Sequence, residues 1–114
     1  MNEEIDYFKA FYDGHPANLE KEINSFLSIN EGKIKIVKRL LISSAGGGIQ
    51  IILGCQDAHC SFLEQVKVFN LYGDICTAIE DLNKTMEKEK IKVVDIFIWH
   101  MELKPSVAVL FYKK

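Results

Sequence analysis

The residues best suited to bind a metal lie in one short segment, CQDAHC at 55–60. The segment holds two thiols, an imidazole and a carboxylate, which are the ligand types of zinc sites in proteins. A structural zinc site takes four ligands, usually as two separated pairs, and the sequence has no second pair. We therefore interpret the segment as an ordinary connector and predict no metal site and no cofactor.

Cysteine and histidine could also form a nucleophilic dyad. The candidate nucleophiles are Cys60 and Cys76, and the candidate bases are His15, His59 and His100. No known local signature surrounds any of these residues. We expect Cys76 to be a packed thiol on a helix. No catalytic residue is predicted, and the chain is expected not to be an enzyme.

Three glycines at 46–48 could offer backbone N–H groups to a phosphate. Phosphate loops work at the N-terminus of a helix, whereas this loop joins two predicted strands. The glycines therefore predict a flexible hairpin.

The best candidate for ligand binding is an aromatic patch. Phe97 and Trp99 fall on one face of a predicted strand, and His100 follows them. Aromatic surfaces suit planar ligands, but aromatic residues in strands more often serve as core or subunit contacts. Both interpretations stay open at this point.

Composition bounds the class of protein. A length of 114 residues, with 48% hydrophobic and 26% charged, fits one folded domain, 1–114. The net charge of -2 comes without a basic run, so nucleic acid is not an expected partner. No apolar stretch approaches the roughly 20 residues of a bilayer span, and the three cysteines fit free thiols. A cytoplasmic protein without membrane contact is expected.

The expected elements run strand, helix, strand, strand, and then repeat. Pro16 and Asp74 mark the helix starts, Asp74 as an N-cap. Both helices carry an apolar stripe, Leu19, Ile23, Phe26 and Leu27 in the first and Ile75, Ile79, Leu82 and Met86 in the second. The expected strands are 5–12, 34–42, 49–53, 64–72, 91–99 and 107–112, and the helices follow residues 16 and 74.

Near-constant spacing between similar residues indicates an internal duplication, with repeats at 5–55 and 64–113. The matched pairs are Ile34 with Ile91, Phe11 with Phe69, Ile49 with Val107 and Asn24 with Asn83, and the spacing within a pair barely changes along the chain. The predicted fold class is α+β, a tandem duplication of a β-α-β-β unit with a mainly antiparallel sheet and two helices on one face. Two unrelated halves of a mixed fold are the alternative.

Both faces of the predicted strands are largely apolar. A helix covers one face of a sheet, so we expect the other face to be partly buried by a second copy or a bound molecule. Lys38 and Asp95 fall at equivalent positions on that second face and could pair across a pseudo-two-fold axis. With Phe97, Trp99 and His100 they form the predicted ligand-binding set.

The order of elements resembles the strand-helix-strand-strand module. The residues that carry the likeness are Val66 to Tyr72, Asp74 to Met86, Ile91 to Trp99 and Val107 to Tyr112. Dodecins use one copy of the module and assemble into shells that hold flavin, and the gyrase-inhibitory-protein-like and SOUL folds use a tandem pair to form a small-molecule pocket. The resemblance implies a groove or a subunit contact where two units meet, and no binding residue is carried over from it.

We therefore predict a non-enzymatic protein that binds a small planar or nucleotide-like molecule and self-associates, most simply as a dimer. The alternative is a ligand-free protein-protein interaction or inhibitor module, such as a bacterial accessory protein or one encoded by a phage. An enzyme that uses cysteine and histidine is a third hypothesis.

Overall fold

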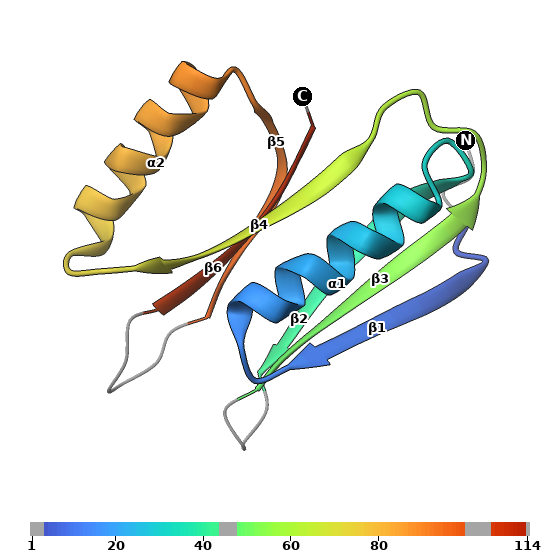
Figure 1. Ribbon diagram of the computed structural model, residues 1–114, viewed down its shortest axis with the longest axis horizontal. Helices are drawn as coiled ribbons and strands as arrows, with labels where there is room; N and C mark the ends of the chain where they lie inside the picture. The colour runs from blue at the N-terminus through green and yellow to red at the C-terminus, as the bar shows by residue number, and fades with distance from the viewer. Residues whose placement is uncertain (1–3, 44–47, 100–105, 114) are drawn as a thin grey trace. The chain divides into compact units, whose positions relative to one another are not determined.

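The computed structural model describes residues 4–43, 48–99 and 106–113. The chain folds as two compact units, Met1–Leu63 (unit 1) and Glu64–Lys114 (unit 2). Figure 1 shows each helix beside the sheet of its own unit. Unit 1 contains β1 (Tyr7–Asp13), α1 (Pro16–Ile29), β2 (Ile34–Ser43) and β3 (Ile49–Asp57), and unit 2 contains β4 (Glu64–Leu71), α2 (Ile75–Glu89), β5 (Lys92–Trp99) and β6 (Ser106–Lys113).

The α+β class and the tandem of β-α-β-β units are confirmed. The described residues form two antiparallel sheets of three strands, in the order β1-β3-β2 in unit 1 and β4-β6-β5 in unit 2. In each unit the last strand therefore lies in the middle, between the strand that precedes the helix and the strand that follows it. Each helix has a three-stranded sheet of its own.

A β-bulge at the same place in both units supports the duplication. The register shifts between Ile36 and Lys38 in β2 and between Val93 and Asp95 in β5. These two sites are separated along the chain by the same spacing as the matched residues Ile34 and Ile91. A bulge adds one residue to one strand and increases the local twist, and such irregularities are kept within related folds. The sequence predicted the equivalence of Lys38 and Asp95 but not the bulge.

Strand pairing corrects one of the predicted matches. Phe11 lies opposite Ile51, and its match Phe69 lies opposite Ala108, so Ala108 is the equivalent of Ile51. Ile49 therefore corresponds to Ser106 and not to Val107, the match that the sequence suggested. The correction matters because a slip of one residue moves every side chain to the other face.

The two helices begin and end differently. Pro16 occupies the first turn of α1, whose N-cap residue His15 makes no side-chain cap bond. The predicted N-cap of α2 is confirmed, since the Asp74 carboxylate accepts from the Thr77 backbone N–H at 3.3 Å. Gly73 before this cap and Lys90 after the helix both have positive φ, at 71° and 55°. The chain thus turns sharply at each end of α2.

The core of unit 1 lies between α1 and its sheet. Leu19 and Ile23 are fully buried, Leu27 is 4% exposed, and the helix-side residues of β3 include the fully buried Ile51 and Leu53. Phe11 of β1 contacts Phe26 of α1, which places α1 on this face. The apolar stripe predicted for α1 therefore packs as expected.

Helix α2 packs much less closely. Every residue of α2 is described and none is buried, and Ile75, at the start of the predicted stripe, is 45% exposed. Cys76 is exposed, so its prediction as a packed thiol is wrong. Neither of the two helices in the described ranges is long and apolar enough to cross a membrane.

Candidate ligand-binding groove

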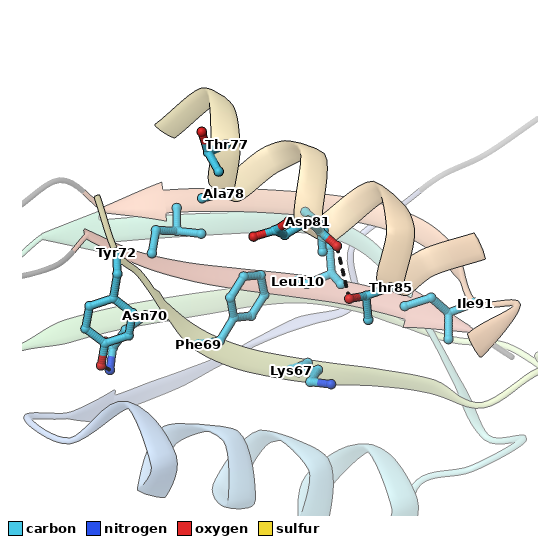
Figure 2. Close-up of a pocket in the computed structure, with 12 residues that line it drawn as sticks. Lys67, Phe69, Asn70, Tyr72, Thr77, Ala78, Asp81, Thr85, Ile91 and Leu110 are labelled. Carbon is cyan, nitrogen blue, oxygen red and sulfur yellow. Dashed lines mark hydrogen bonds between the residues drawn. The ribbon is translucent and has the colours of Figure 1, made fainter. Parts of the chain in front are cut away.

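A cavity of about 360 Å³ lies in unit 2 between α2 and the sheet (Figure 2). We call it the α2 groove. Ligand pockets in proteins commonly range from about 300 to 1,000 Å³, so the α2 groove is large enough for a small molecule. Its strand side is Lys67, Phe69, Asn70, Leu71, Tyr72 and Leu110, its helix side is Thr77, Ala78, Asp81, Leu82 and Thr85, and Ile91 lines it as well.

The α2 groove exists because two helix residues are smaller in unit 2 than in unit 1. When the N-cap residues His15 and Asp74 are matched, Ala78 falls at the position of Leu19 and Thr85 at the position of Phe26. Leu19 is fully buried, whereas Ala78 and Thr85 are only half-buried and line the cavity. Loss of the larger side chains leaves space that the neighbouring atoms do not fill.

The aromatic ring on the strand side shows the same contrast. In unit 1 the rings of Phe11 and Phe26 meet edge to face, with centroids 5.6 Å apart. Phe69 matches Phe11 in unit 2 and is half-buried, and no other residue of the described ranges makes a ring or cation contact with it. Figure 2 shows the Phe69 ring between β4 and α2, with Asp81 and Thr85 on the helix side. One ring is therefore available to a ligand.

Unit 1 has a hollow of about 580 Å³ at the matching edge, wider open than the α2 groove and lined by residues of β1 and α1 that include Phe11 and Phe26. The Lys9 ammonium lies there, 5.6 Å from the ring centroid of Phe11 and 5.8 Å from that of Phe26. Its match in unit 2 is Lys67, whose Nζ lies 4.0 Å from Glu89 Oε2 instead. The cation that covers the aromatic pair in unit 1 is thus directed elsewhere in unit 2.

The polar atoms of the α2 groove are few, and most come from its helix side. The Thr85 hydroxyl donates to the Asp81 carbonyl at 3.1 Å, and the Thr77 hydroxyl donates to the Asp74 carboxylate at 3.3 Å. The Asn70 amide donates to the Tyr72 hydroxyl at 3.2 Å, but strand pairing puts the Asn70 side chain on the face of the sheet away from α2, the face of Trp99. A mainly apolar lining with a few polar groups on one side is typical of a site that orients a small ligand.

The described members of the predicted ligand-binding set do not line this groove. Phe97 is half-buried on the other face of its sheet, with its ring edge to face against the buried Phe111 at 6.0 Å. Trp99 is half-buried on that face, and the Asp95 carboxylate accepts from the Ile96 N–H at 2.8 Å. The contact with Phe111 favours the packing interpretation of Phe97.

Two further members of the predicted set lie elsewhere. Lys38 is exposed on β2 of unit 1, and His100 lies outside the described residues. The pairing of Lys38 with Asp95 therefore stays a prediction. On the sheet face of unit 1 that α1 leaves uncovered, Phe8, Tyr12, Leu40 and Ile42 are all exposed, so burial of that face by the fold itself is not seen there.

The cysteine segment is divided between a strand and a connector. Cys55 is buried in β3, and burial raises the pKa of its thiol, as does the nearby Asp57, while a hydrogen bond with Tyr7 opposes the shift. His59 Nδ1 lies 3.2 Å from the Gly32 carbonyl oxygen. The described ranges hold no cluster of three or more His, Cys, Asp or Glu side chains placed to hold a metal.

Sequence reasoning missed the groove residues Phe69, Ala78, Asp81 and Thr85. A signal was present, because the repeat spacing already matched Phe69 with Phe11 and implied a match of Thr85 with Phe26. Comparisons with models of protein families, with curated proteins and with solved structures find no match to this chain. The resemblance to dodecins and to the tandem-pocket folds therefore stays a prediction.

Proposed function

We propose that the protein binds a small planar molecule in the α2 groove and does no chemistry on it. The observation that carries the proposal is the Phe69 ring, which lines a cavity of about 360 Å³ at the place where Phe26 meets Phe11 in unit 1. A flat ligand in this position would restore the aromatic contact that unit 1 makes internally. Such contacts contribute roughly 0.5–1.5 kcal/mol beyond the burial of area.

The test is a thermal-shift and calorimetric titration with indole, a neutral planar probe. At 100 times its dissociation constant a ligand adds about 2.7 kcal/mol to the free energy of unfolding. Thr85→Phe should abolish binding because it places in the groove the ring that unit 1 has at Phe26. Asn83→Phe adds the same ring to an exposed helix position outside the groove and should leave binding intact.

Two results would contradict the proposal. The first is the absence of any binding by the unmodified protein, and the second is equal binding by the Thr85→Phe and Asn83→Phe variants. Equal binding would place the probe somewhere other than the α2 groove.

Self-association is a second candidate function, and it is compatible with the first. It is favoured by four exposed apolar side chains on the sheet face of unit 1 that α1 leaves uncovered: Phe8, Tyr12, Leu40 and Ile42. Apolar groups gathered on one face are typical of interaction surfaces. Sedimentation equilibrium should give a dimer that Leu40→Lys weakens, and a monomer at every concentration would contradict this candidate.

A further inference from the structure

We propose that the α2 groove selects molecules that carry an ammonium group on a short chain attached to a single aromatic ring, that is, small arylalkylamines. The inference rests on the proposed function of the groove and specifies its ligand class. Three observations carry it: the arrangement in unit 1, the hydrogen-bonding character of the groove, and the charges in its lining.

Unit 1 already contains the arrangement that such a ligand would make. The Phe26 ring meets Phe11, and the Lys9 ammonium lies close to both ring centroids, at 5.6 and 5.8 Å. A cation in this position is attracted by the electron-rich faces of the rings. In unit 2 both partners are missing, because Thr85 replaces Phe26 and Lys67 turns to Glu89. An arylalkylamine supplies a ring and a cation together.

The helix side of the groove presents acceptors. The hydroxyl protons of Thr77 and Thr85 are both donated within α2 and its cap, so their oxygens face a ligand as acceptors. The Asp81 carboxylate makes no hydrogen bond or ion pair with any described residue. An ammonium group has three donors and no acceptor, which complements these atoms.

The charges in the groove point the same way. Its lining holds one acidic side chain, Asp81, and one basic side chain, Lys67. Glu89 lies 4.0 Å from the Lys67 ammonium and offsets its charge, whereas no basic side chain of the described residues pairs with Asp81. A phosphate or carboxylate would meet an unpaired negative charge. The nucleotide-like ligands predicted from the sequence are therefore disfavoured relative to planar cations.

Three probes of matched shape test the charge preference: 2-phenylethylammonium, 2-phenylethanol and 3-phenylpropionate. Calorimetry at low ionic strength should show the ammonium probe binding about fivefold to tenfold more tightly than the alcohol. The gain is expected because the ammonium group is attracted by both the Asp81 carboxylate and the Phe69 ring. The carboxylate probe should bind most weakly. The preference for the ammonium probe should shrink at about 0.5 M salt, since salt screens exposed charges.

Asp81→Asn keeps the shape of the groove and removes its unpaired charge. The substitution should lower the affinity for the ammonium probe about threefold to fivefold, as expected for the loss of an exposed charge pair. The affinity for the alcohol probe should not change. Glu80→Gln is the matched control, because Glu80 is an exposed neighbour outside the groove, and it should change neither affinity.

The outcomes separate this inference from the function on which it rests. If all three probes bind equally and Thr85→Phe abolishes their binding, the groove binds planar molecules but the inference of an amine is overturned. The same holds if Asp81→Asn and Glu80→Gln behave alike. If no probe and no indole binds, the proposed function itself fails.

Discussion

In unit 1, Phe26 of α1 packs against Phe11 of the sheet, whereas in unit 2 the matching residue is Thr85 and a groove lies beside Phe69. The two units share element order, strand order and bulge position. The difference between the closely packed helix of unit 1 and the groove of unit 2 therefore arises from side-chain size at two helix positions, where Leu19 and Phe26 are replaced by Ala78 and Thr85.

The two helices also differ in how much they should contribute to the stability of their units. A closely packed helix stabilises its unit through burial, because protein interiors gain from close packing. Helix α2 gives up part of that gain, with no buried residue along its length. Its cap compensates in part, since Asp74 binds the first turn and His15 does not.

The largest expected difference between the units concerns the centre of each helix. Ile23→Ala removes a fully buried side chain and should cost about 2–5 kcal/mol of unfolding free energy. Leu82→Ala, at the matching but half-buried position, should cost about 1 kcal/mol, because the groove already exposes part of that side chain. Urea denaturation followed by circular dichroism measures both. Equal losses would mean that α2 packs as closely as α1.

Opening unit 1 is the second prediction. Phe26→Thr gives α1 the residue of α2, and a loss of about 2 kcal/mol is expected because the Phe26 ring is half-buried and contacts Phe11. The variant should also gain a second binding site for indole in unit 1. If calorimetry still shows one indole bound per chain, the Phe26 ring would not be the sole difference that prevents binding in unit 1.

Closing unit 2 is the reciprocal change. The double variant Ala78→Leu with Thr85→Phe restores the side chains of α1, and each buried methylene contributes about 0.8 kcal/mol. Part of this is offset by imperfect fit, so a net gain of about 1–2 kcal/mol is expected together with loss of probe binding. A destabilised double variant that still binds the probe would contradict the equivalence of the two helix-sheet interfaces.

The smallest predicted difference lies at the helix caps. Asp74→Ala removes a cap whose loss typically costs about 1 kcal/mol. His15→Ala should have almost no effect, because His15 makes no side-chain cap bond. Thermal denaturation of the two variants side by side is the measurement, and a larger loss for His15→Ala would reverse the assignment of the caps.

The order of elements and the start of α2 could be predicted from the sequence because they depend on local patterns. The Asp74 cap and the stripe of α1 are set by neighbours in the chain. How closely α2 packs on its sheet does not depend on local sequence patterns. It depends on how Ala78 and Thr85 of the helix meet Phe69 of the facing strand. An apolar stripe such as the one that begins at Ile75 shows which side of a helix is apolar, not how much of it is buried.

The aromatic site shows the same limit. Phe97 and Trp99 were correctly placed on one face of a strand, because alternation fixes the faces. Their neighbours were not predictable, since Phe111 faces Phe97 only once the last strand lies in the middle of its sheet. Spacing alone matched Phe69 with Phe11. Whether each ring is covered depends on the helix residue opposite it, Phe26 in unit 1 and Thr85 in unit 2.

The central claim is that unit 2 binds a planar cation at the place that unit 1 fills with its own side chains. The most direct measurement is a nitrogen-15 NMR titration of the unmodified protein with 2-phenylethylammonium. We predict that the amide signals of Phe69, Ala78 and Thr85 shift, while those of the matching residues Phe11, Leu19 and Phe26 do not. Shifts of equal size in both sets, or shifts confined to residues around Trp99, would contradict the account.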